Sequence, residues 1–304
     1  MDDLLQVEVN AEQLKEETEH ELQEMLESVP GKKILGLDPS LGGMLSLVTN
    51  FAELKEKYDI SLIFKIQEES DIDLDPGETV IYLTMPEVQM MRNIAYQIHG
   101  HQRKEIDADY YIYICPRKTL ICEKILQIEG VLDLVAVEDF ELALIPMDKD
   151  LISLEYKGSF KHVISDETTS LYHNVAEAVK KLESYYGKIQ HKYGKGKGAH
   201  KVLKILKDLE AIDDLADDEL ESQIDCAIFV DRTVDLITPF CTQFTYEGMI
   251  DDMYSIENSH ICVPGTLIGL ETDEKKMLPL NSEDEFYEEV RNLHFSVLRT
   301  LFTG

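Results

Sequence analysis

One glycine- and lysine-rich stretch of this chain has residue types that could bind an anion. Residues 193–198 read Tyr-Gly-Lys-Gly-Lys-Gly, and four further lysines lie close by in the sequence: Lys188, Lys192, Lys201 and Lys204. Glycines and lysines ahead of a helix can present backbone N–H groups to a phosphate. The stretch follows no predicted strand and has no Ser or Thr to hold magnesium, so it does not match a Walker motif. We interpret it as a solvated loop or a docking patch for an acidic protein surface, with phosphate binding by Gly194–Gly198 as the alternative.

A second stretch, residues 228–248, places polar residues directly after an apolar run. It reads Ile-Phe-Val-Asp-Arg-Thr-Val-Asp-Leu-Ile-Thr-Pro-Phe-Cys-Thr-Gln-Phe-Thr-Tyr-Glu-Gly. Asp231 and Arg232 lie where a predicted buried strand, residues 226–230, leaves its sheet. Asp235 is near enough for Arg232 to form a hydrogen-bonded pair that fixes the turn. We predict a structural role: Arg232→Ala should leave Asp235 unpaired and lower stability, by on the order of 1 to 3 kcal/mol if the site is buried.

Other patterns that carry chemistry are missing from the sequence. The turn after the first predicted strand, residues 38–43, reads Asp-Pro-Ser-Leu-Gly-Gly and lacks both G-x-G-x-x-G and the lysine of a P-loop. There is no G-x-S-x-G elbow, and no Cys or His pairs occur at zinc spacing. Among sixty acidic residues, two carboxylates occur at any spacing by chance, so they do not indicate acid–base catalysis. The sequence predicts no catalytic site, no cofactor and no metal.

The composition limits the classes of partner. The 304 residues are 44% hydrophobic, which suits two or three domains with their own cores. Sixty acidic against twenty-nine basic residues give a net charge of -31, which disfavours nucleic acid and direct docking to anionic membranes. No apolar run is long enough to insert into a membrane, no signal peptide is present, and the five cysteines fit reduced thiols. We therefore expect a cytoplasmic protein that reaches membranes only through partners.

Five short apolar runs alternate with helical stretches between residues 31 and 147. The runs are residues 34–37, 61–66, 80–84, 110–115 and 131–137. Strands that are apolar on both faces and separated by helices imply right-handed crossovers and a parallel sheet covered on each side. The helical stripes expected to face this sheet run from Met44 to Tyr58, from Val88 to Ile98, and through Leu120, Ile125 and Ile128. An acidic lead-in helix within residues 1–30 precedes this doubly wound α/β domain.

A second unit is expected after residue 148. Its predicted elements are a helix from about Ser170 to Gly187, another across residues 199–209, and the buried strand 226–230. The acidic segment 208–225 suggests a surface loop or a frayed helix end. A hairpin-like stretch follows, and Ser282 with Glu285 predicts a capping box for a final helix whose stripe runs from Phe286 to Leu301. Because nothing follows to pack against that stripe, we expect the chain to be part of a longer protein.

The stretch 228–248 resembles the signature of the Sec/Munc (SM) family of regulators of SNARE-mediated membrane fusion, in its vacuolar protein sorting branch. Runs at residues 115–132, 144–154 and 166–173 agree with that resemblance, which covers roughly residues 31 to 302. The signature residues to which we assign a structural role are Asp231, Arg232, Asp235, Pro239, Tyr246 and Glu247.

The resemblance implies three domains and no catalytic activity. Residues 1–148 would form an α/β first domain, 149–249 the first half of an α/β second domain, and 250–304 the beginning of a mainly helical third domain. It also implies that the protein binds SNARE helices and templates their assembly. Its setting would be the HOPS or CORVET tethering complex, where it pairs with a helical scaffold subunit on endosomal, lysosomal or vacuolar membranes.

The expected contact face lies at the carboxyl ends of the strands of the first domain. Open α/β sheets bind ligands in the crevice at this edge, and members of the SM family place SNARE helices on the same side. The residues that this edge carries here are Asp38, Gly43, Gln67, Glu68 and Glu69.

Overall fold

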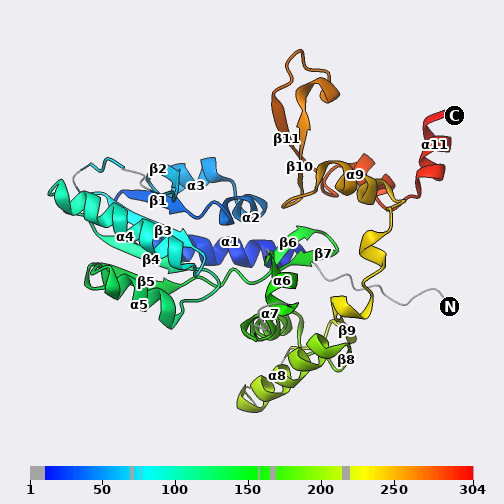
Figure 1. Cartoon of the computed structure of the whole chain (residues 1–304), viewed down its shortest axis with the longest axis horizontal. Coiled ribbons are helices and arrows are strands. Elements are labelled where there is room, and N and C mark those ends of the chain that lie inside the picture. The colour runs from blue at the N-terminus through cyan, green and yellow to red at the C-terminus, as the bar shows by residue number, and fades with distance from the viewer. Residues whose placement is uncertain are drawn as a thin grey trace. The chain divides into compact units, whose positions relative to one another are not determined.

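A computed structural model gives the structure of the chain (Figure 1). It describes residues 11–68, 72–75, 77–156, 158–164, 169–213 and 220–303. The chain divides into two compact units, of which one comprises Gln13–Ile145 and the other contains Pro146–Gly304. The three-domain assignment made from the sequence remains a prediction. Among the described residues, none of the helices is long and apolar enough to cross a membrane.

The unit Gln13–Ile145 is built on a five-stranded parallel sheet (Figure 1). Its strands are β1 (Lys33–Leu37), β2 (Ile60–Lys65), β3 (Thr79–Thr84), β4 (Tyr110–Ile114) and β5 (Val135–Asp139). They are arranged in the order β2-β1-β3-β4-β5, and every neighbouring pair is parallel. All residues of β1 and β3 are buried, as expected for central strands covered on both faces. The α/β fold class predicted from the sequence is confirmed.

Helices cover both faces of this sheet. They are α1 (Ala11–Ser28), α2 (Leu41–Val48), α3 (Phe51–Lys57), α4 (Val88–Arg103) and α5 (Leu120–Ile128). One face packs on α4 and α5 through a core that includes Tyr82, Ile112 and Leu126. On the opposite face the Ser28 hydroxyl of α1 bonds the Tyr113 hydroxyl of β4 at 3.3 Å. The predicted lead-in helix is therefore confirmed as α1.

The single helix predicted across Met44–Tyr58 is two helices. Thr49 has extended backbone and ends α2, and the Asn50 side chain then accepts a hydrogen bond from the Ala52 N–H and caps α3. The stripe predicted for α5 is wrong at Leu120 and Ile128 but right at Ile125, which is partly buried against the core. Cys122 and Leu126 are buried against the core, whereas Leu120 and Ile128 are mostly exposed.

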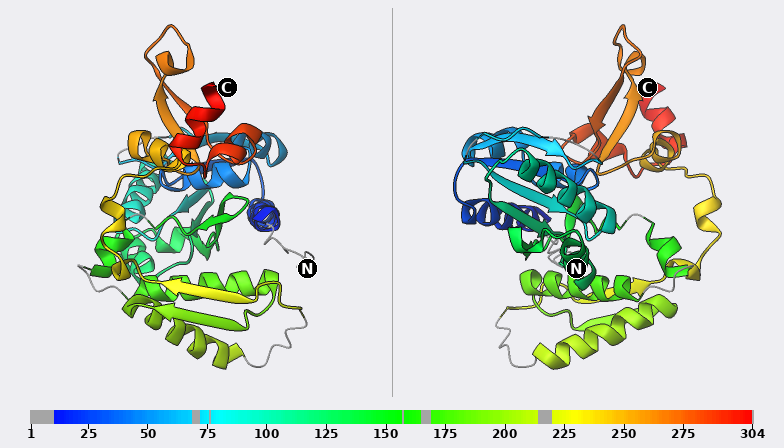
Figure 2. Two further views of the ribbon diagram at one scale, coloured as in Figure 1. Left: turned by 90° about the vertical axis from the view of Figure 1, so that its right-hand side faces the viewer. Right: turned by 60° about the vertical axis from the view of Figure 1, so that its left-hand side comes forward.

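The second unit contains two helices packed beside a parallel strand pair, followed by a hairpin and short helices (Figure 2). Its elements are β6 (Ile145–Asp148), β7 (Leu151–Ser153), α6 (Ser159–Ile164), α7 (Ser170–Tyr186), β8 (His191–Lys195), α8 (Lys197–Asp213), β9 (Cys226–Val230), α9 (Tyr246–Tyr254), β10 (His260–Pro264), β11 (Lys275–Pro279), α10 (Glu285–Val290) and α11 (Phe295–Thr303). The helices α7 and α8 pack together around Ala176, Val202 and Leu206. The helices predicted at about 170–187 and 199–209 are present, and so is the hairpin.

Two expectations for this unit are wrong. The strand β9 is not buried on both faces, because Ile228 is 73% and Val230 is 64% exposed. The final helix is split into α10 and α11. Its expected cap, Ser282, instead bonds the Asp148 carboxylate through its hydroxyl at 2.9 Å, while Asp284 caps α10 by accepting from two backbone N–H groups.

Candidate functional site

The two motifs singled out in the sequence lie side by side. The strand β8 pairs with β9 in parallel, and Lys195 is opposite Val230. The loop that follows β8 therefore meets the turn that follows β9. The expectation that the glycine–lysine stretch follows no strand is wrong. The strand β8 reads His-Lys-Tyr-Gly-Lys, and it lacks the apolar run by which a strand is recognised in a sequence.

Asp231 occupies the N-terminus of α8. Its carboxylate accepts hydrogen bonds from the Gly198 N–H at 2.5 Å, from the Thr233 N–H at 2.9 Å and from the Thr233 hydroxyl at 3.0 Å. The bond from the Thr233 N–H, helped by that from Gly198, holds the pKa of Asp231 below its usual range. One side chain thus caps both α8 and the short helical turn Arg232–Val234.

Two glycines of the loop make this approach possible. A Cβ atom on Gly198 would lie 2.7 Å from Asp231 Oδ2, and one on Gly196 would overlap the Asp231 side chain. Gly196 also has φ of +100°, a conformation that L residues rarely adopt. The glycines therefore serve the contact with Asp231. The N-terminus of α8 carries the partial positive charge of its backbone N–H groups, but the Asp231 carboxylate already occupies it. This helix terminus is therefore not open to a phosphate.

Arg232 and Asp235 interact, but not as predicted. Arg232 donates to the backbone carbonyl of Asp235 at 2.6 Å, while the Asp235 carboxylate accepts from the backbone N–H groups of Ile237 and Thr238 and from the Thr238 hydroxyl. The hydrogen bond from that hydroxyl lowers the pKa of Asp235. Because the Asp235 carboxylate would keep its bonds to Ile237 and Thr238, the loss of Arg232 would not leave Asp235 unpaired. Both Arg232 and Asp235 are exposed.

The remaining signature residues begin two short helices. Pro239 lies at the start of the turn Thr238–Phe240, where the missing N–H of proline costs no bond. Tyr246 and Glu247 open α9 and donate their backbone N–H groups to the carbonyls of Leu293 and Arg291, at 3.1 Å each.

Arg291 ties the same region to the β6–β7 turn. It donates to Asp148 at 2.8 Å and to Asp150 at 2.5 Å, and its hydrogen bond holds the pKa of Asp150 below the usual range. Ser259 adds a hydrogen bond to the Met147 carbonyl. These bonds join the first residues of this unit to its α9–α10 segment.

The residues expected to form the contact edge of the five-stranded sheet differ in their exposure. Asp38 is wrong as a residue facing a partner: it is 3% exposed, and its carboxylate accepts from Ser40 and from the Met85 N–H at 3.1 Å, which joins the ends of β1 and β3. Gly43 is half-buried within α2, and Gln67 and Glu68 are exposed after β2. Glu69 lies outside the described residues.

The sequence reasoning missed an apolar surface at the same edge. The helix α5 begins after the carboxyl end of β4, and its first two residues, Leu120 and Ile121, are 85% and 60% exposed. Single exposed apolar side chains are ordinary on protein surfaces, but adjacent ones at a sheet edge favour a contact. The sequence did contain a signal for this surface, because α5 has more apolar residues than one face of a helix can bury.

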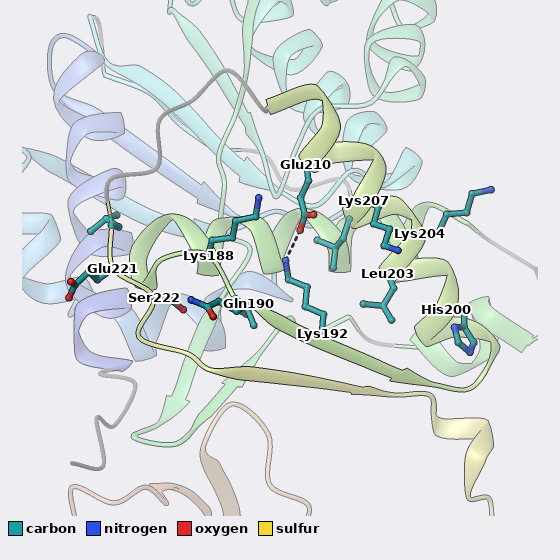
Figure 3. Close-up of a pocket in the computed structure, with 13 residues that line it drawn as sticks. Lys188, Gln190, Lys192, His200, Leu203, Lys204, Lys207, Glu210, Glu221 and Ser222 are labelled. Atoms are coloured by element: carbon teal, nitrogen blue, oxygen red, sulfur yellow. Dashed lines mark hydrogen bonds and ion pairs between the residues drawn. The ribbon is translucent and has the colours of Figure 1, made fainter. Parts of the chain in front are cut away.

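A lysine-lined cavity of about 920 Å³ lies beside α8 (Figure 3). One wall holds an ion triad, in which Lys192 of β8 contacts Glu183 of α7 at 2.7 Å and Glu210 of α8 at 2.5 Å. Burial lowers the pKa of Lys192, but the hydrogen bonds that its ammonium group donates to Glu183 and Glu210 outweigh this effect, and the pKa is raised overall. Across the part of the chain that the structure describes, no group of three His, Cys, Asp or Glu residues is arranged to hold a metal ion.

The sequence matches the model of the Sec1 family over residues 33–303. The chain belongs to the Sec1 family. It is 36% identical over 297 residues to a vacuolar protein-sorting-associated protein 33 homolog of Arabidopsis thaliana, covering 95% of this chain and 49% of that protein. It is 32% identical over 308 residues to vacuolar protein sorting-associated protein 33A of Rattus norvegicus, covering 97% and 51%. The chain spans about half the length of the curated relatives it matches, and the resemblance found in the signature residues is confirmed.

Two solved structures share the fold of this chain. The SM protein Vps45 in complex with the Qa SNARE Tlg2 matches with a TM-score of 0.66 at 16% identity, covering 94% of this chain and 51% of that chain. The Unc18–syntaxin 1 complex from Monosiga brevicollis matches with a TM-score of 0.62 at 16% identity, covering 93% and 51%.

Proposed function

We propose that this chain is a noncatalytic regulator of SNARE-mediated membrane fusion that binds SNARE helices and templates their assembly. The observation that carries the proposal is the Sec1-family match across residues 33–303. The resemblance of the fold to SM proteins solved with SNAREs supports it. Ordering flexible SNARE helices on a preformed surface would lower the entropic cost of their assembly.

The proposed contact face is the carboxyl edge of the five-stranded sheet. Gly43, Gln67 and Glu68 remain candidates, and the exposed apolar pair Leu120 and Ile121 is added to them. An amphipathic SNARE helix needs an apolar surface to bury its own apolar face, and this pair offers one. Polar side chains at the same edge would set the orientation of the helix.

The test is a pulldown of the chain with SNARE-motif peptides. We expect Leu120→Asp with Ile121→Asp to reduce capture of the cognate SNARE about tenfold or more, because a charge would replace the apolar contact. Ile128→Asp is the matched control, since Ile128 is 67% exposed at the other end of the same helix. Wild-type protein that captures no SNARE motif would refute the proposed function, and equal losses in both variants would refute the contact face.

The finer part of the proposal concerns the cellular setting. We infer that the chain acts within a HOPS or CORVET tethering complex, beside a helical scaffold subunit, in traffic to the endosome, lysosome or vacuole. Similarity to proteins named for vacuolar protein sorting supports this setting. Co-purification of the tagged chain from its own cells should recover a helical scaffold subunit, and a membrane fraction that lacks endosomal and vacuolar markers would contradict it.

A phosphate- or nucleotide-binding enzyme that uses the Gly194–Gly198 loop is the second candidate. Exposed Lys195 and Lys197 favour it, but the Asp231 carboxylate at the start of α8 disfavours it. Calorimetric titration with ATP and magnesium separates the two. We expect no binding, and micromolar binding that is lost in Lys195→Ala with Lys197→Ala would favour the enzyme.

A further inference from the structure

The cavity beside α8 combines an apolar interior with a cationic rim. Ile189 and Leu206 are buried in its wall, Leu203 is half-buried, and Leu220 stands 55% exposed at its edge. A volume of about 920 Å³ is in the range that holds several side chains or a small organic ligand. The interior would therefore favour a ligand with apolar groups to bury.

The rim residues come mostly from α8. They are His200, Lys204 and Lys207, joined by Lys188 from the segment before β8 (Figure 3). All four are exposed, and none makes an ion pair with another residue that the structure describes, whereas Lys192 is neutralised by Glu183 and Glu210. The cavity lining also includes the exposed acid Glu221. Because Lys188, Lys204 and Lys207 outnumber this acid, the rim is positive in a chain of net charge -31, which otherwise repels anions.

The spacing of these residues suits a peptide. His200, Leu203, Lys204 and Lys207 follow an i, i+3, i+4, i+7 pattern, so they share one face of α8 over about two turns. A surface of this kind matches an amphipathic segment that repeats apolar and acidic residues at a similar spacing. A bare phosphate would leave the apolar interior unused.

We propose that this cavity binds an acidic amphipathic peptide segment of a partner protein. Aliphatic side chains of that segment enter between Ile189 and Leu203, and its carboxylates pair with Lys188, Lys204 and Lys207. This surface lies in the unit containing Pro146–Gly304 and is separate from the contact edge proposed for SNARE helices. Its occupant and its test do not depend on SNARE binding.

Fluorescence anisotropy with a labelled peptide that repeats Glu-Glu-Leu-Leu tests the proposal on the full chain. Two matched peptides replace Leu by Ser, which keeps the charge, or Glu by Gln, which keeps the apolar groups. We expect the first peptide to bind and both matched peptides to bind at least about tenfold more weakly, because apolar and ionic contacts are both needed. Binding should weaken as salt is raised, since the rim is exposed.

Two cavity variants and one control locate the site. Lys204→Glu with Lys207→Glu should lower affinity about tenfold or more, and Leu220→Ser, at the exposed lip, should lower it several-fold. The control is Lys55→Glu with Lys124→Glu, which makes the same change of charge on exposed helical lysines of the other unit and should leave affinity within about twofold. Unchanged thermal melting of each variant shows that it is folded.

Several results would overturn the proposal. Absence of binding at low salt would do so, as would equal affinity for the Ser peptide or equal losses in the cavity and control variants. A final experiment measures binding of inositol hexakisphosphate to the same variants. If it binds through Lys204 and Lys207 while the Glu-Leu peptide does not, the cavity is a polyphosphate site and the peptide assignment is wrong.

Discussion

Asp231 is the residue that holds the turn after β9 against the start of α8. It receives hydrogen bonds from two backbone N–H groups that belong to different elements, Gly198 at the start of α8 and Thr233 after β9. The sequence indicated a structural role for this position, but it pointed to Arg232 as the anchor. The true partner, Gly198, is 33 residues away in the chain, so only the pairing of β8 with β9 reveals it.

Asp231→Ala should destabilise the protein by about 1 to 2 kcal/mol, because it removes the cap of α8 and that of the turn Arg232–Val234 together. Urea denaturation measures the change. Asp225→Ala is a suitable control, since Asp225 is an exposed acid just before β9 whose side chain makes no hydrogen bond to any described residue. Equal effects of the two substitutions would show that Asp231 is not a cap.

The same residue predicts a pH dependence. The folded-state pKa of Asp231 is lowered from 3.8, so its contribution to stability is present above that value and is lost as pH falls through the lower folded-state pKa. The stability difference between the wild type and Asp231→Asn should therefore be constant near neutral pH and shrink below about pH 4. Denaturant midpoints measured across this range check the sign. A difference that grows with acid would contradict it.

Arg232→Ala should now have a smaller effect than the sequence suggested. The side chain is exposed and donates to a backbone carbonyl, and the Asp235 carboxylate keeps its bonds to Ile237 and Thr238. We expect a loss below about 1 kcal/mol, as is usual for an exposed hydrogen bond. A melting temperature that falls as far as that of Asp231→Ala would show that the guanidinium group has a larger structural role.

At the scale of elements, apolar runs predicted the parallel sheet well and the second unit less well. The strands β1 to β4 are apolar runs within one residue of their predicted starts, because burial on both faces requires such runs. The strand β8 has alternating polar residues and Gly194, so its pattern does not stand out. On α5, more positions are apolar than one face can bury, so periodicity selected Leu120 and Ile128 instead of Cys122 and Leu126.

The triad around Lys192 joins three elements, β8, α7 and α8. Lys192→Met should cost about 2 kcal/mol, because Glu183 and Glu210 would keep their charges in a half-buried site without a counterion. Adding Glu210→Gln should recover part of the loss, and a double-mutant cycle measures the coupling. Additive losses in the cycle would contradict the triad.

The triad also predicts an alkaline transition. The pKa of Lys192 is raised above 10.5 in the folded protein, so its contribution is fully present below that value and is lost as pH rises through the higher folded-state pKa. Urea midpoints of the wild type and Lys192→Met should therefore converge only at strongly alkaline pH. Convergence at neutral pH would show that the ammonium group contributes little.

Substitutions on the buried side of α5 should lower stability far more than substitutions on its exposed side. Leu126→Ala removes a fully buried side chain and should cost about 2 to 5 kcal/mol. Ile128→Lys changes a side chain that is 67% exposed and should stay within about 0.5 kcal/mol of the wild type. Chemical denaturation of both variants compares them directly, and a large loss in Ile128→Lys would place that residue against the core.

At the scale of the molecule, the end of the alternating pattern led us to predict a domain boundary near residue 147, and the chain divides into two compact units between Ile145 and Pro146. The domain assignment itself stays a prediction. The acidic character that disfavours nucleic acid is read directly from the composition. The sequence could not predict the cavity beside α8, since Ile189, Leu203 and Leu220 come from separate parts of the chain that only the fold brings together. The sites that pattern reasoning missed are those made by contacts between distant segments.

Limited proteolysis should leave a resistant fragment that begins at α1 and ends near Ile145. The helix α1 belongs to this core because Leu14, Leu22 and Leu26 are each at most 2% exposed. A fragment of residues 11–145 should unfold in one cooperative transition, whereas residues 32–145 should be less stable because they lose the apolar contacts of α1. Equal stability of the two fragments would contradict this role for α1.

The carboxylate at the start of α8 has a consequence for how new chemistry could arise in this fold. In many α/β proteins the start of a helix after a parallel strand is where a ligand's negative charge is received. Here the chain supplies that charge itself, from a residue two positions from the Thr233 N–H that shares it. Asp231→Gly would remove this charge and leave the N–H groups of Gly198 and Thr233 without their acceptor. The Asp231 side chain is therefore the group that keeps the start of α8 from receiving an external anion.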